Sequence, residues 1–78
     1  MQCLGLEIRE RRLQLNLSQE KLAFGAGVHP NVIGRLERGL GNPGIKTLWK
    51  ISQELHVTFG DLFTGAEVRI LQGGATAT

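Results

Sequence analysis

The sequence predicts a compact all-α domain made of five short helices. Apolar residues recur at helical spacing in five successive segments, and residues that start or stop helices separate these segments. The 78 residues are enough for one modest core and too few for an enzyme with a large enclosed site. A hydrophobic content of 41% is typical of a folded globular protein and argues against extensive disorder.

The first helix is predicted over residues 4–15. Leu4, Ile8 and Leu15 lie on one stripe of this helix and are expected to enter the core. Charged residues face outwards, and Arg12 lies beside the apolar stripe.

The segment 17–38 predicts two short helices joined by a tight turn. Ser18 is a good N-cap for the first helix, and Gly27 ends it. Pro30 suits the first position of the next helix, because the amide that proline lacks would have no partner there. The small Ala23 allows the two helices to cross closely. The segment therefore has the design of a helix-turn-helix motif.

The second helix of this motif is predicted to run to Gly39. Opposite its apolar stripe stand Asn31, Gly34, Arg35 and Arg38. These are basic or hydrogen-bonding groups around a residue without a side chain, and they form a candidate binding face.

Basic charge is concentrated in the part of the chain that contains the motif. Residues 1–50 hold eight Lys or Arg against four acids, a net charge of +4, whereas residues 51–78 hold one against three, a net charge of −2. A domain that presents one face to a polyanion has this asymmetry, and so does a domain with an ordinary solvated helical face.

A loop follows the motif, and a fourth helix is predicted from Ile45 to about His56. Its buried stripe is expected to comprise Ile45, Leu48, Ile51 and Leu55. Trp49 stands next to this stripe, at the edge of the core or in a subunit interface.

The pattern Thr58-x-x-Asp61 predicts the start of a short fifth helix, which Gly65 is expected to end. Large apolar residues crowd one turn of this helix, and a subunit interface is a natural destination for some of them. The predicted organisation is one domain over residues 1–65 and a partly disordered tail over residues 66–78. In the tail, the residues Val68, Ile70 and Leu71 predict either a short strand or an extra helical turn docked on a partner.

From about residue 4 to residue 62 the chain resembles the Cro and phage-repressor type of helix-turn-helix domain, also called XRE-like. The residues that carry the resemblance are Gln19, Leu22-Ala23, Gly27-Val28, Ile33, Leu36-Glu37-Arg38-Gly39, Asn42-Pro43, Leu48, Ile51, Leu55 and Val57. The resemblance implies a lambda-repressor-like fold. It also implies a sequence-specific transcriptional regulator, of repressor or controller type, that reads the major groove of double-stranded DNA as a homodimer on a roughly palindromic operator.

For a DNA-binding domain of this kind, the chemistry of the side chains suggests roles for particular residues. Arg35 is the best candidate for a base contact, bidentate to a guanine, and Asn31 suits an adenine edge. Pro30 and His29 are candidates to pack on a thymine methyl group or a phosphate. The expected phosphate contacts are Gln19, Ser18, Arg38, Lys46 and Asn42. For Ser18 a plain N-cap, and for Asn42 and Lys46 a plain solvent loop, remain the alternatives.

Two further features are implied by the resemblance. The first is a partly buried, structural ion pair between Arg12 and Glu37. The second is a dimer interface at the last helix, for which the candidates are Phe59, Leu62, Phe63 and Trp49.

The sequence offers nothing that indicates catalysis, a cofactor or a metal site. His29 and His56 stand in different segments, and no Ser, Cys or carboxylate has nucleophile or metal-ligand spacing around them. Cys3 cannot form an internal disulfide, because it is the single cysteine. No apolar run approaches the roughly 20 residues of a membrane span, so a cytoplasmic location is expected. The alternative function is a protein-interaction module or an antitoxin-like domain on the same fold.

Overall fold

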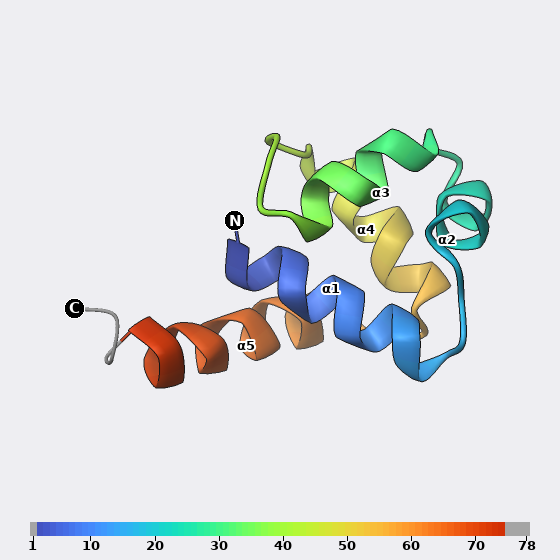
Figure 1. Ribbon diagram of the computed structural model, residues 1–78. Coiled ribbons are helices and arrows are strands. Elements are labelled where there is room, and N and C mark those ends of the chain that lie inside the picture. The colour runs from blue at the N-terminus through green and yellow to red at the C-terminus, as the bar shows by residue number, and fades with distance from the viewer. Residues whose placement is uncertain (1, 75–78) are drawn as a thin grey trace.

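The computed structural model describes residues 2–74, which form five α-helices and a short π-helical segment and contain no strand. The helices are α1 (Gln2–Gln14), α2 (Gln19–Ala26), α3 (Pro30–Glu37), α4 (Ile45–Glu54) and α5 (Phe59–Arg69), and the π-helical segment is η1 (Ile70–Gly74) (Figure 1). The predicted all-α, five-helix fold is confirmed.

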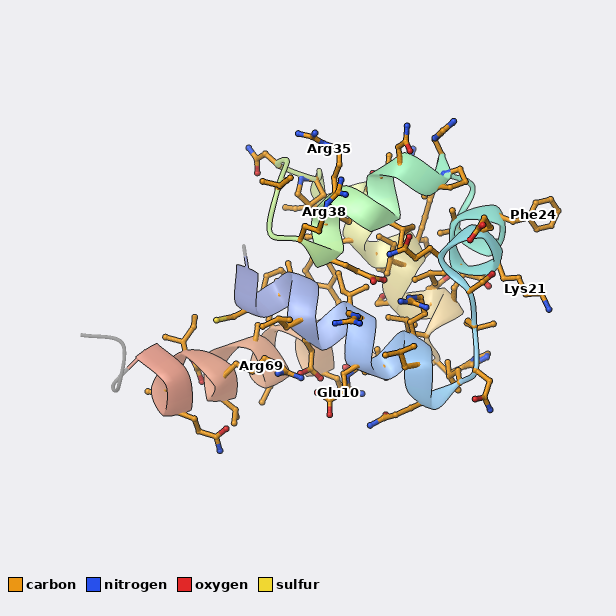
Figure 2. The ribbon with its side chains drawn as sticks, viewed as in Figure 1. Glu10, Lys21, Phe24, Arg35, Arg38 and Arg69 are labelled. Carbon is orange, nitrogen blue, oxygen red and sulfur yellow. The ribbon has the colours of Figure 1, made fainter. Side chains whose placement is uncertain are left out.

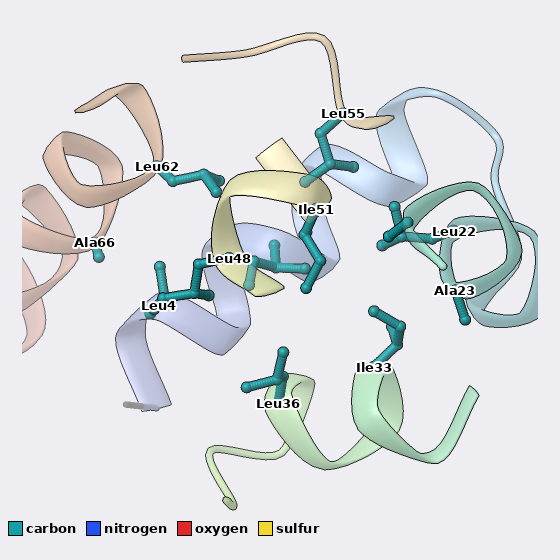
Figure 3. Packing of buried hydrophobic residues seen from close by; sticks show 12 residues of the cluster. Leu4, Leu22, Ala23, Ile33, Leu36, Leu48, Ile51, Leu55, Leu62 and Ala66 are labelled. Atoms are coloured by element: carbon teal, nitrogen blue, oxygen red, sulfur yellow. The ribbon is translucent and has the colours of Figure 1, made fainter. Parts of the chain in front are cut away.

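The helices enclose one apolar core. α2 and α3 form the helix-turn-helix pair, α4 packs against α2, and α5 runs back along α1 (Figure 1). Buried apolar side chains from all five helices meet between them (Figure 3). They are Leu4, Ile8, Leu22, Ala23, Ala26, Ile33, Leu36, Leu48, Ile51, Leu55, Leu62 and Ala66.

Local chemistry explains where most helices begin and end. Ser18 caps α2, and Gly27 ends it with a φ of 70°, in the left-handed region that suits a residue without Cβ. Thr58 and Asp61 form a capping box at the start of α5. The hydrogen bonds that Asp61 makes with Thr58 hold the pKa of this carboxyl below its ordinary value.

Two residues that the sequence predicted for the core are exposed, so those predictions are wrong. Leu15 is 41% exposed, because α1 ends at Gln14 and the chain turns through Asn16, whose φ is 57°. Ile45 is 76% exposed. As the first residue of α4, it stands at the end of the helix, beyond the buried residues of the same stripe.

Leu62, in contrast, was predicted to be at a surface and is buried. It was expected at the dimer interface, but none of its surface is exposed and it belongs to the core of the single chain. Its position in the first turns of α5 places it against the core, so it has no surface to offer to a partner.

The prediction that Gly65 ends the last helix is also wrong, because α5 continues to Arg69. A Cβ on Gly65 would stand 2.4 Å from the carboxyl carbon of Glu7, so this glycine allows α5 to approach α1 closely. Arg69 Nε then donates a hydrogen bond of 3.0 Å to Glu7 Oε1, and Arg69 also pairs with Glu10. Val68, Ile70 and Leu71 therefore lie in helical structure, not in a strand. The predicted flexible end of the tail lies largely outside the described residues.

Gly5 is a second packing glycine, on the other side of α1. A Cβ on Gly5 would stand 1.9 Å from the carbonyl oxygen of Leu36, so only glycine allows α1 to lie this close to α3. This contact fixes the end of α3 against the rest of the domain.

Candidate nucleic-acid interface

The outward face of α3 carries the residues predicted to contact bases. His29 and Pro30 stand at its start, Asn31 lies in its first turn and Arg35 lies one turn further on, and all four are exposed. Figure 2 shows Arg35 projecting from α3 into solvent, and Arg38, the C-cap of the helix, is also exposed. The structure therefore gathers these side chains on one helix whose opposite face is buried.

His29 has a structural role that the sequence analysis did not assign. Its Nδ1 accepts a hydrogen bond of 3.1 Å from the backbone N–H of Asn31, so His29 is the N-cap of α3. Pro30 follows at the first helical position. A polar residue directly before this proline was the signal that could have indicated the cap.

The predicted phosphate contacts come from three places. Ser18 Oγ accepts a hydrogen bond of 3.0 Å from the backbone N–H of Lys21, and Gln19 opens α2 beside it. Asn42 lies in the loop before α4 and Lys46 in the first turn of α4, and both are exposed. The N-termini of α2 and α4, which carry the positive ends of the helix dipoles, thus stand near these side chains.

A shallow hollow of about 330 Å³ lies between α3 and the loop that leads to α4. Arg35 and Asn42 both line it, together with Leu40 and Thr47. The structure therefore brings a candidate base contact of α3 next to a candidate phosphate contact of the following loop.

The ion pair between Arg12 and Glu37 is present and buried. Arg12 Nε donates to Glu37 Oε2 at 2.7 Å, and Nη2 of the same guanidinium group donates to Glu37 Oε1 at 3.0 Å. Arg12 also donates to the carbonyl oxygen of Leu17 at 2.8 Å. Gln19 Nε2 donates to Glu37 Oε1 at 3.1 Å. This network links α1, the start of α2 and the end of α3.

The part that Gln19 takes in this network is absent from the sequence analysis, which assigned Gln19 to a phosphate. The two bonded residues are 18 positions apart, so no local spacing indicates their contact.

An apolar surface on α4 and α5 contains most of the residues predicted for a dimer interface. Trp49 is 50% and Phe63 is 43% exposed, and the rings of Phe59 and Phe63 lie 4.9 Å apart. Ile45, which the sequence analysis placed in the core, lies beside Trp49 and Phe59 around an apolar hollow of about 500 Å³. We call these four residues, Ile45, Trp49, Phe59 and Phe63, the α4–α5 surface.

Phe24 is the most exposed large apolar side chain among those described, at 89%. Figure 2 shows Phe24 and Lys21 projecting from α2, on the side of the molecule away from Arg35. Phe24 and Lys21 therefore lie outside the candidate interface.

Over residues 2–74, no group of three or more His, Cys, Asp or Glu side chains is placed to hold a metal ion. None of the helices in this range is both long and apolar enough to cross a bilayer.

Comparisons with known proteins agree with the geometry. The control protein C.BamHI of Bacillus amyloliquefaciens is 42% identical over 59 residues, which are 74% of this chain and 73% of that protein. The restriction-modification controller protein C.AhdI of Aeromonas hydrophila superposes with a TM-score of 0.77 at 33% identity, over 78% of this chain and 92% of its own.

The clp gene regulator ClgR of Corynebacterium glutamicum has the same fold, with a TM-score of 0.93 at 22% identity over 97% of this chain and 81% of its own. A family model described as helix-turn-helix matches residues 8–62, the segment that holds the α2–α3 pair and most of its supporting core. The chain therefore belongs to the helix-turn-helix family.

Proposed function

We propose that this chain is a transcriptional regulator that binds double-stranded DNA sequence-specifically, as a homodimer. The observation that carries the proposal is the outward face of α3, where Asn31 and Arg35 are exposed on a helix whose other face is buried. An α-helix fits the major groove of B-DNA, where each base pair presents a distinct set of donors and acceptors.

In this proposal, the first two turns of α3 read bases. Arg35 donates two hydrogen bonds to guanine O6 and N7, and Asn31 pairs with the edge of an adenine. Pro30 and His29 pack on a thymine methyl group or a neighbouring phosphate. Each good bidentate contact discriminates against a wrong base by about 1 to 3 kcal/mol.

The remaining candidates position the domain on the DNA backbone. Ser18 and Gln19 at the start of α2, with Asn42 and Lys46 near the start of α4, surround helix N-termini that favour a phosphate. Arg38 adds a positive charge at the end of α3. These contacts set the register of the protein and increase affinity for all sequences alike.

The α4–α5 surface is the proposed dimer contact. Large, partly exposed aromatic side chains next to an apolar hollow form the kind of surface that a second subunit covers. A two-fold axis through this surface would place two α3 helices about 34 Å apart, on a roughly palindromic operator. The similarity to two proteins named as controllers favours a controller role over other regulatory roles.

The proposal assigns no catalytic step and no cofactor to the chain. Because its partner is DNA, we propose that it acts in the cytoplasm. The alternative is a protein-interaction module, which the exposed Phe24 on α2 favours as a second candidate. That module would use a surface distinct from the α3 face, so one experiment can separate the two functions.

The test is selection of bound duplexes from a random DNA pool, followed by affinity measurements for the selected site at several salt concentrations. We expect a palindromic site and a steep loss of affinity with salt. Arg35→Ala should relax base choice at one position of each half-site, whereas Lys46→Ala should weaken binding to all sequences alike and reduce the salt slope. Failure of the wild-type protein to enrich any duplex would contradict the proposal and favour the protein-interaction module.

A further inference from the structure

Gly34, in the middle of the proposed recognition helix, has no side chain. Asn31, Gly34 and Arg38 are spaced by three and four residues, so they lie on one stripe of α3. Gly34 is nevertheless partly covered, although Asn31 and Arg38 on either side of it are exposed. A side chain from another helix lies close to this position.

The covering group is the side-chain amide of Gln19, which belongs to α2. Gln19 Oε1 lies 3.6 Å from the place where a Cβ on Gly34 would stand, and no other described atom outside Gly34, its two chain neighbours and the nearby backbone of α3 comes within 4 Å of that place. The amide thus occupies the outward surface of α3 at the position where residue 34 has no side chain.

Gln19 is held there by a fixed partner. Its Nε2 donates to Glu37 Oε1 at 3.1 Å, and Glu37 is itself bound through both oxygens by the guanidinium group of Arg12. Because Glu37 is buried and doubly bonded, it can orient the amide of Gln19 before any ligand binds. One N–H of the amide is used in this contact, while the second N–H and the amide oxygen Oε1 have no partner among the described residues.

We infer that Gln19 reads a base, although it lies outside the recognition helix, and that Glu37 positions it for this purpose. A free amide N–H together with a free amide oxygen is the pair of groups that recognises N6 and N7 of adenine in the major groove. A side chain already held in place loses less conformational entropy on binding. The inference rests on the proposed function, and it assigns Gln19 a base-reading role in place of a purely phosphate-binding one.

The experiment is a measurement of affinity for the selected operator and for all its single base-pair variants. For Gln19→Ala we expect one position in each half-site to lose its preference for adenine, a preference of about 5- to 150-fold in the wild type. The preference that Arg35 sets at another position should be unchanged. A Gln19→Ala variant that binds every sequence more weakly by the same factor, or keeps every base preference, would overturn the inference.

Two variants of Gly34 test the geometry independently. In Gly34→Ala the new Cβ would be in ordinary contact with Gln19 Oε1 at 3.6 Å, so base preferences should be kept. In Gly34→Leu the longer side chain should displace the amide and remove the same adenine preference as Gln19→Ala. Retention of that preference in Gly34→Leu would also overturn the inference. Thermal unfolding of each variant shows that the fold is intact, and absence of any selected operator for the wild type would instead refute the proposed function itself.

Discussion

Arg12 and Glu37 show how much one pair of residues can determine in a domain of this size. Their side chains are 9% and 3% exposed, and every hydrogen bond of the pair joins two different parts of the chain. Removal of Arg12 would leave a buried carboxylate without its counter-charge, and such losses cost about 3 to 5 kcal/mol. We therefore expect Arg12→Met to lower the free energy of unfolding by about this amount, measured by urea denaturation.

Arg11 provides the matched control for this prediction. It pairs with Glu7 at 2.6 Å on the same helix, but its side chain is 29% exposed. This pair is less buried than the Arg12–Glu37 pair, and Glu7 keeps Arg69 as a second partner, so Arg11→Met should cost much less than Arg12→Met. The double variant Arg12→Met with Glu37→Leu should recover much of the lost stability, because an apolar pair of similar volume can replace a buried ion pair. Equal effects of Arg11→Met and Arg12→Met would contradict this account.

At the scale of the helices, Gly5 of α1 packs against the backbone of α3 with no room for a side chain. The carbonyl oxygen of Leu36 would stand 1.9 Å from a Cβ on Gly5, and this oxygen belongs to the backbone, which cannot move aside as a flexible side chain can. We expect Gly5→Ala to push the two helices apart and to lower the free energy of unfolding by about 1 to 3 kcal/mol, as overpacking does.

Gly60→Ala is the control for Gly5→Ala, measured in the same denaturation experiment. Gly60 also lies in a helix, but the nearest atom to its added Cβ would be Thr58 Oγ1 at 3.8 Å, an ordinary contact. Alanine is the better helix former by about 1 kcal/mol, so Gly60→Ala should be neutral or stabilising. A stabilising effect of Gly5→Ala would contradict the claim that the backbone of α3 leaves no room for a Cβ at residue 5.

Helix boundaries that depend on local chemistry can be predicted from the sequence, whereas close contacts between helices cannot. Ser18, Gly27 and Pro30 act through residues next to them in the chain, so the boundaries of α2 and the start of α3 follow from local chemistry. Gly5 and Gly65 act through residues of another helix. Gly65 therefore looked like a helix stop in the sequence, and only the packed structure shows that it permits a close approach instead.

For the molecule as a whole, the sequence predicts some features of the candidate interface, whereas others depend on how the helices pack. The gathering of Asn31 and Arg35 on one helical face could be predicted because it depends on helical periodicity alone. The contact of Gln19 with Glu37 and the exposure of Ile45 depend on how α2, α3 and α4 are placed in space. The charge asymmetry along the chain pointed to a polyanion, but it did not identify which groups would face it.

The assembly of the whole molecule gives the last prediction. If the α4–α5 surface is the dimer contact, Phe63→Glu would place a charge without a partner in a desolvated interface. Substitution of a central interface residue lowers the binding free energy by about 2 kcal/mol or more, so the dimer dissociation constant should rise by at least about 30-fold. Sedimentation equilibrium measures this directly, and the emission of Trp49, the single tryptophan, reports the same transition because Trp49 lies on the proposed surface.

Phe24→Glu is the matched control for the dimer, because it introduces the same charge at an exposed phenylalanine of α2. It should leave both the sedimentation profile and the Trp49 emission unchanged. Since two α3 helices must bind one palindromic site together, Phe63→Glu should also weaken operator binding at low protein concentration and regain it as the concentration rises. A wild-type chain that sediments as a monomer at micromolar concentration, with and without the operator, would contradict the homodimer.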